Sequence, residues 1–94
     1  MQRINYQHLY YFWVVAKQGS ISAACEILHL AQPTISAQLA IFETQLGNKV
    51  FDRQGRKLLL TDTGRVVFHY AEEIFNLGQE LKHVLKGLHT ERGL

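Results

Sequence analysis

Polar and small side chains share one side of the segment between residues 32 and 46. Apolar residues recur there at steps of four, three and four, which predicts a helix with one apolar stripe. The residues off the stripe are Gln32, Pro33, Thr34, Ser36, Ala37, Gln38 and Ala40. Glutamine can pair with adenine, hydroxyl groups can bond several base edges, and proline or alanine can contact a thymine methyl group. One interpretation is therefore a helix that reads DNA bases. The alternative is an ordinary amphipathic helix whose polar side faces solvent, and this helix alone does not decide between the two.

A basic segment with a glycine near its centre follows this helix. Gly55 lies among the charged and polar residues 52–57, and apolar runs at 50–51 and 58–60 flank them, which predicts a β-hairpin. Residues 49–65 hold five basic and two acidic side chains, although the whole chain carries a formal charge of only +2. A basic, glycine-tipped hairpin after a helix pair is typical of a wing that reaches a minor groove. A solvated surface turn is the alternative.

Two short helices must position these residues. Asn5 is a good N-cap for a helix over residues 6–18, and Gly19 ends it. Ser20 caps a second helix over residues 21–28, and a tight break at 29–31 leads to the third, where Pro33 is tolerated in the first turn. In such a pair the first helix braces the second, whose N-terminal residues face the bases in the major groove.

A long helix follows the hairpin, capped by Thr61 or Asp62 and ending near residue 88. Its apolar residues alternate three and four apart over three heptads. They are Val67, Tyr70, Ile74, Leu77, Leu81, Val84 and Leu88, called the seam below. So small a domain cannot cover the seam together with the other faces of the helix. We therefore expect a second copy of the chain to bury it, with the small Ala71 and Gly78 allowing close approach.

The predicted fold class is mainly α: a winged helix-turn-helix, with three helices and a β-hairpin wing, followed by a long dimerisation or linker helix. Residues 1–61 form the winged helix-turn-helix, 62–89 the long helix, and 90–94 the start of a linker. The longest apolar run falls short of the roughly 18 residues of a membrane span, and the first five residues lack a signal-peptide pattern. A single cysteine, Cys25, fits a reducing interior, so we expect a cytoplasmic protein.

Catalytic and metal-binding chemistry finds no support in the residue pattern. The five histidines lack metal-ligand spacing, and His69 with Glu73 suits a side-chain pair on one helix face. No nucleophilic triad, carboxylate pair or glycine-rich phosphate loop stands out. We expect no metal, no cofactor and no enzyme activity. A protein-docking module remains the competing function, but it should show an apolar patch where Ser36 and Gln38 lie.

The ungapped pattern over residues 9–64 resembles the LysR-type transcriptional regulators. The residues that carry the resemblance are Gly19-Ser20-Ile21, Ala24, Leu28-His29, Gln32-Pro33-Thr34-Ile35-Ser36, Gln38-Leu39, Phe42-Glu43, Leu46-Gly47, Val50-Phe51, Arg53, Gly55-Arg56, Leu60-Thr61 and Gly64. The first residues resemble one branch of the family, the activators of sodium/proton antiporter genes. The residues in question are Ile4-Asn5-Tyr6 and His8-Leu9-Tyr10-Tyr11-Phe12-Trp13.

The resemblance implies roles for particular residues in double-stranded DNA binding. The third helix becomes the recognition helix, and its residues nearest the bases are Gln32, Pro33, Thr34, Ser36 and, more weakly, Gln38. Arg56 matches the wing arginine that enters the minor groove, and Arg53 a basic position that meets phosphate. Lys57 adds charge to the wing, and Ser20 and Ser22 offer hydroxyl and backbone N–H groups to a phosphate.

Two departures from the family pattern qualify these roles. Residues 31–46 contain no lysine or arginine, although many members have arginine at the position of Ala37 or Ala40, so a guanine-reading arginine from this helix is in doubt. Ile41 lies off the apolar stripe and is either covered or an exposed apolar spot. Family members also continue into an effector-binding domain. We therefore expect a fragment that dimerises through residues 62–89, belongs to a tetramer in the full-length protein, and lacks the effector-binding domain.

Overall fold

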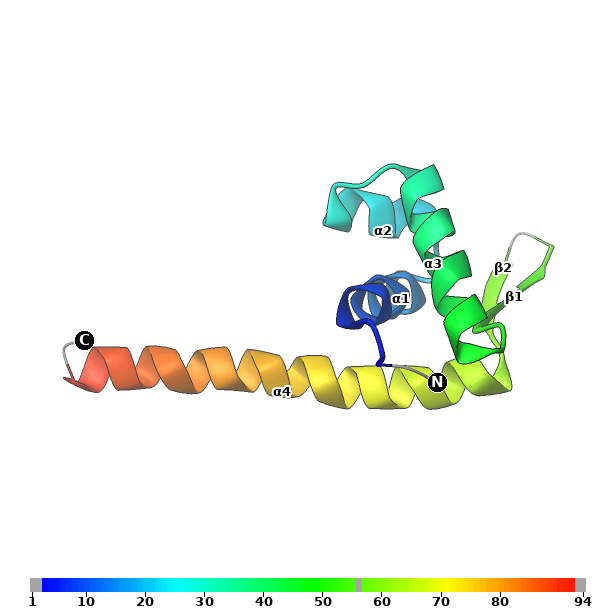
Figure 1. The fold of residues 1–94 in the computed structure, drawn as a ribbon. Helices are drawn as coiled ribbons and strands as arrows, with labels where there is room; N and C mark the ends of the chain where they lie inside the picture. Colours follow the sequence, from blue (N-terminus) through cyan, green and yellow to red (C-terminus); the bar gives the residue numbers. More distant parts are fainter. Residues whose placement is uncertain (1–2, 56, 93–94) are drawn as a thin grey trace.

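The computed structural model describes the backbone of residues 3–55 and 57–92, and their side chains as far as Leu88 (Figure 1). The elements in chain order are α1 (Tyr6–Gln18), α2 (Ile21–Leu28), α3 (Gln32–Leu46), β1 (Phe51–Gln54), β2 (Lys57–Leu60) and α4 (Asp62–Arg92). This order confirms the predicted class, three helices and a hairpin followed by a long helix.

The predicted caps delimit the first two helices. The side chain of Asn5 accepts hydrogen bonds from the backbone N–H groups of Gln7 and His8, at 2.9 and 3.1 Å. Gly19 ends α1 in the left-handed region at φ 72°, where glycine is favoured. The Ser20 hydroxyl accepts the N–H of Ala23 at 3.0 Å and so starts α2. These local signals fix both helices at the predicted residues.

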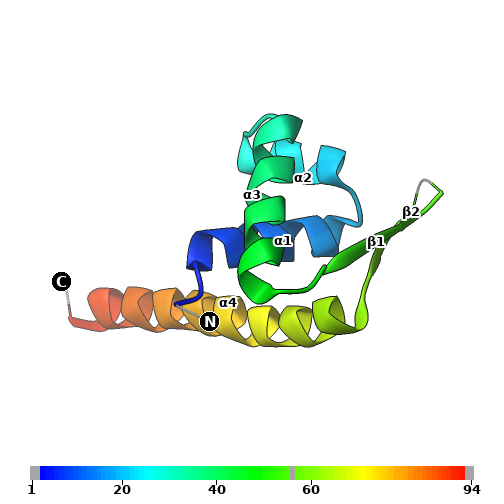
Figure 2. The ribbon, with the colours of Figure 1, turned by 45° about the vertical axis from the view of Figure 1, so that its right-hand side comes forward.

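Helix α1 lies in the middle of the domain and packs against α2, α3 and α4 (Figures 1 and 2). Phe12 and Val15 are fully buried on α1, as is Ile35 on α3. The Phe12 ring lies 5.9 Å from that of Phe42 on α3 and 5.2 Å from that of Phe51 on β1, measured between ring centroids. Because α3 buries this apolar stripe against α1, its other side is left for solvent or a ligand.

The N-terminal part of α4 packs on α1 and thereby joins the long helix to the domain. The indole N–H of Trp13 donates to the Glu72 carboxylate at 2.6 Å, and the Phe75 ring lies 5.0 Å from the indole. Ala71 is fully buried in the same core, and Val67 packs against it half-buried. The expectation that Ala71 would allow close approach of a second helix is therefore wrong, since it contacts its own domain.

The hairpin is antiparallel and pairs Phe51 with Leu60 and Gln54 with Lys57. Gly55 turns the chain at φ 62°, a conformation that suits glycine. The strands differ slightly from the predicted ones: β1 begins at Phe51 and extends through polar residues to Gln54. Val50, expected in this strand, lies just before it and is fully buried.

Helix α4 begins after a cap that the sequence had left open between two residues. The Thr61 hydroxyl accepts the N–H of Gly64 at 2.9 Å, so Thr61 is the cap. The helix ends at Arg92 and includes residues that were expected to start a linker after position 89. Its C-terminal half projects beyond the rest of the domain (Figure 1).

A methyl group at position 64 is expected to destabilise the fold. A Cβ atom built on Gly64 would collide with the backbone carbonyl oxygen of Val50 and lie 3.1 Å from Cδ2 of Leu60. Because a backbone atom must move, Gly64→Ala should lower the free energy of unfolding by about 1–3 kcal/mol. Gly87→Ala, on the same helix and in open space, is the control and should be neutral or stabilising. Urea unfolding of the two variants measures this, and equal midpoints would contradict the close approach.

Candidate nucleic-acid interface

The exposed side of α3 presents most of the residues predicted to contact bases. Gln32, Pro33, Thr34 and Ser36 are all exposed, whereas Gln38 is half-buried. These four residues lie in the first two turns of α3, next to α2 and away from α4 (Figures 1 and 2). The structure therefore gathers polar groups at the projecting end of α3, and Gln38 is the least accessible of the five.

The first turn of α3 leaves backbone donors without side-chain partners. Its N-cap, Ala31, makes no side-chain cap bond, and the turn contains no acidic residue. Pro33 occupies a position in this turn where the missing N–H costs nothing. A helix N-terminus of this kind carries a partial positive charge, which favours an approaching phosphate.

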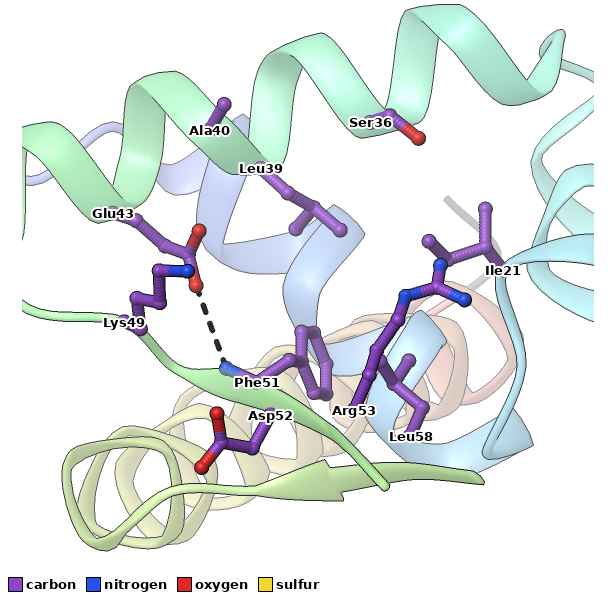
Figure 3. A pocket seen from close by; sticks show the side chains of 10 residues that line it. All are labelled: Ile21, Ser36, Leu39, Ala40, Glu43, Lys49, Phe51, Asp52, Arg53 and Leu58. Carbon is purple, nitrogen blue, oxygen red and sulfur yellow. Dashed lines mark hydrogen bonds between the residues drawn. The ribbon is translucent and has the colours of Figure 1, made fainter. Parts of the chain in front are cut away.

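A groove of about 460 Å³ separates α3 from the hairpin. Figure 3 looks into it, with Ser36 and Ala40 on the α3 side and Arg53 reaching from β1 toward Ile21. The residues that line it are Ile21, Ser36, Leu39, Ala40, Glu43, Lys49, Phe51, Asp52, Arg53 and Leu58. A polar helix face and a basic hairpin therefore stand on two sides of one groove. Glu43, to which the sequence analysis assigned no role, lies between them.

A smaller hollow of about 140 Å³ brings together residues from three separate segments. Ser20 and Ser22 come from the start of α2, Gln32 from the start of α3, and Arg53 from β1. The Ser20 hydroxyl accepts one bond from the N–H of Ala23, so its own hydrogen remains available to donate. The residues predicted to meet phosphate are thus neighbours, which their separation in the sequence did not reveal.

The cations of the hairpin and its flanks differ in their surroundings. The Arg53 and Lys57 side chains are exposed on the two strands. Arg65 forms an ion pair with Asp62 and donates to the Leu60 carbonyl at 3.2 Å, so part of its charge is already engaged. Arg56, the predicted minor-groove residue, lies outside the residues that the structure describes.

An apolar face on α4 forms a second candidate interface. Tyr70, Leu77 and Leu81 are 59%, 64% and 59% exposed, although large apolar side chains are usually buried. The residues that line the groove along this face are Ile74, Leu77, Gly78, Glu80, Leu81 and Val84. Val67 packs on its own domain, so the exposed part of the seam begins at Tyr70. Ile41 on α3 was expected to be either covered by another element or exposed. Its side chain is 45% exposed, so it forms an exposed apolar spot.

The described residues also bear on a metal site, on the predicted His69–Glu73 pair and on a membrane span. Within them no three His, Cys, Asp or Glu side chains come together as a metal site would require. His69 and Glu73 form the predicted pair, with Nε2 and Oε1 3.1 Å apart, and both are exposed. None of the described helices has the length and hydropathy to cross a membrane.

Comparisons with known proteins show what this arrangement is similar to. A family profile described as "Bacterial regulatory helix-turn-helix protein, lysR family" matches residues 6–65. The transcriptional activator protein NhaR of Escherichia coli is 44% identical over 85 residues, which are 90% of this chain and 28% of NhaR. The RuBisCO operon transcriptional regulator of Allochromatium vinosum is 38% identical over 85 residues, again 28% of its length. The chain thus spans under a third of these relatives.

A solved structure with the same arrangement contains DNA. The BenM DNA-binding domain, in complex with catB site 1 DNA, superposes with a TM-score of 0.80 at 27% identity, over 89% of this chain and 94% of that one.

Proposed function

Because this chain belongs to the bacterial lysR family of regulatory helix-turn-helix proteins, we propose that it binds double-stranded DNA sequence-specifically as a dimer. In this proposal α3 lies in a major groove, and the hairpin lies in the adjacent minor groove. The observation that carries it is the pairing of the exposed α3 face at Ser36 with a basic hairpin across one groove (Figure 3).

Each part of the arrangement has a role in the proposed complex. Gln32, Thr34 and Ser36 form hydrogen bonds with base edges, and Pro33 packs against the bases. These four residues can reach the bases because they occupy the projecting end of α3. Ser20, Ser22 and Arg53 hold a backbone phosphate at the small hollow that they share. Lys57 contacts a phosphate beside the minor groove, and Arg56, as the family resemblance implies, enters that groove.

The dimer is proposed to form through α4. The seam from Tyr70 to Leu88 is exposed within one copy of the chain, and a two-fold contact between identical helices buries it in both copies at once.

The competing docking-module function needs an apolar patch on α3 in place of Ser36 and Gln38. Ile41 is exposed there, but Ser36 and its exposed neighbours are polar or small, which favours DNA.

The curated relatives are longer than this chain, and the similarity to them supports further proposals. We propose that the protein is a cytoplasmic regulator without enzyme activity, that its effector binds outside these 94 residues, and that it assembles into a tetramer. The similarity to the activator NhaR supports a role in gene activation. Membership in the branch that activates sodium/proton antiporter genes remains a prediction.

Removing single groups from α3 should relax base preference without unfolding the chain. Ser36→Ala and Gln32→Ala each delete a group that bonds a base edge, so each should reduce discrimination at one or two base pairs by about 1–3 kcal/mol. Selection of bound sites from random duplex DNA defines the preferred site. Titration of that site and of its single-base variants then measures the loss.

The control is Gln45→Ala, which removes an exposed glutamine from the last turn of α3. It should leave base preference unchanged. If Ser36→Ala and Gln32→Ala lower affinity equally on the selected site and on random DNA, these side chains position the domain and do not read sequence.

A further inference from the structure

Glu43 organises the connection between α3 and the hairpin with both its backbone and its side chain. Its backbone carbonyl accepts the N–H groups of Gly47 and Asn48, at 2.9 and 3.2 Å. Its carboxylate Oε2 accepts the N–H of Val50 at 2.8 Å and that of Phe51 at 3.4 Å (Figure 3). Four N–H groups of this short connection therefore end on one residue of α3.

The start of α4 holds the same connection from its other side. The N–H of Thr61 donates to the Val50 carbonyl at 3.0 Å, and its hydroxyl donates to the Lys49 carbonyl at 2.6 Å. Val50 is fully buried between these contacts, and Gly64 lies against its carbonyl group. Residues 49–51 are consequently fixed relative to α3 and α4 at once.

A carboxylate is an unexpected group at this place. The groove between α3 and the hairpin is where the phosphate strand between a major and a minor groove must pass if the proposed function is right. The negative charge of Glu43 opposes that strand, so a contact with DNA does not account for the residue. Hydrogen bonds from N–H groups to a carboxylate are about twice as strong as those to a neutral acceptor, which does account for it.

We propose that Glu43 is a positioning residue that sets the separation between the base-reading face of α3 and the hairpin. It thereby sets the spacing between the major-groove sequence and the minor-groove flank that the chain accepts. The inference rests on the proposed function. Successive base pairs are about 3.4 Å apart along the duplex. If the position of the hairpin relative to α3 varies by less than this distance, the chain must prefer one spacing between the two sequence elements. A hairpin without the Glu43 contacts accepts several.

The test uses the duplex that the unaltered chain selects from a random pool, with an A·T-rich tract in its flank. The tract is then moved by one base pair in either direction. The narrow minor groove of such a tract attracts cations, so it reports where the hairpin lies. For the unaltered chain we expect affinity to fall about tenfold on both shifted duplexes, and for Glu43→Ala to stay within about twofold across the three.

Two further variants separate the effect of the length of the Glu43 side chain from the effect of its charge. Glu43→Gln keeps the reach and one acceptor oxygen, and should retain most of the spacing preference. Glu43→Asp keeps the charge but is one methylene shorter, and should lose the preference as Glu43→Ala does. If the charge of Glu43 acted on DNA directly, the aspartate variant would behave like the unaltered chain and the glutamine variant like alanine. That result would overturn the proposal.

Thr44→Ala is the matched control, since among the described residues the Thr44 hydroxyl donates to the Ala40 carbonyl of its own helix and not to the hairpin. It should keep the preference. A purely structural role for Glu43 would reduce the folded fraction and lower all three affinities equally, leaving their ratio unchanged, and this too would overturn the proposal. If the unaltered chain ignores the position of the tract, the minor-groove contact itself fails and the inference fails with it. A sharp preference retained by Glu43→Ala and Glu43→Asp would refute the role of Glu43 alone.

Discussion

Leu81→Glu is expected to sediment as a monomer under conditions where the unaltered chain sediments as a dimer. Leu81 lies in the middle of the exposed seam and lines the apolar groove along α4 together with Leu77 and Val84. In a two-fold contact the substitution places a glutamate from each copy near the other. Burying an unpaired charge costs about 3–5 kcal/mol, which is enough to dissociate a dimer of moderate affinity.

The control for this variant is Gln79→Glu. It adds the same charge to the same helix two residues earlier, on the side that also carries Lys82, His83 and Lys86. It should remain dimeric. Sedimentation at concentrations on the order of tens of micromolar decides the matter, because dimer stability depends on protomer concentration. A monomeric unaltered chain, or equal dissociation by both substitutions, would rule out the seam as the interface.

Local sequence signals predicted the helices well because each helix end is decided by a few neighbouring residues. Asn5 and Ser20 accept the first N–H groups of their helices, and Gly19 adopts the left-handed conformation after α1. Gly47 does the same after α3 at φ 77°. These interactions span at most four residues, so the sequence contains all the information that they need.

Contacts between distant segments explain where the sequence prediction was incomplete. Val67 fits the heptad seam of α4 and Ala71 lies beside it, but Trp13 and Phe75 pack α1 onto that part of the helix. Periodicity within one helix cannot show this contact. The strand bounds depended on the pairing of β1 with β2, which extends through polar residues.

In the candidate site, too, the features within one helix could be predicted from the sequence, and the contacts between distant segments could not. The polar face of α3 followed from helical periodicity, since one helix presents it. The hollow shared by Ser20, Gln32 and Arg53 did not, because only the packing of α2, α3 and the hairpin brings them together. Glu43 was a matching motif residue without a role until its bonds to Val50 and Phe51 were visible.

Removing the two described cations of the hairpin should weaken the salt dependence of DNA binding more than any other change in the domain. Helix α3 carries no lysine or arginine, so phosphate neutralisation falls on the hairpin and its flanks. Each phosphate contact contributes about 0.9 to the slope of log affinity against log salt. If Arg53 and Lys57 each meet one phosphate in both copies of a dimer, Arg53→Ala combined with Lys57→Ala lowers the slope by about 3.6.

The matched control for this double variant is Arg3→Ala combined with Lys82→Ala, which removes two positive charges that lie in neither α3 nor the hairpin. Its net charge equals that of the hairpin variant, so a general electrostatic effect would change both slopes alike. Titration of one labelled duplex between about 50 and 200 mM salt is sensitive enough, because a slope difference of about 3.6 alters affinity roughly 100-fold over that range. A slope that stays the same without Arg53 and Lys57 would mean that the hairpin is a solvated turn. A decrease in the slope that occurs only when Arg53 and Lys57 are removed would place one phosphate contact on β1 and one on β2. Both strands lie beside the groove where Glu43 fixes the hairpin.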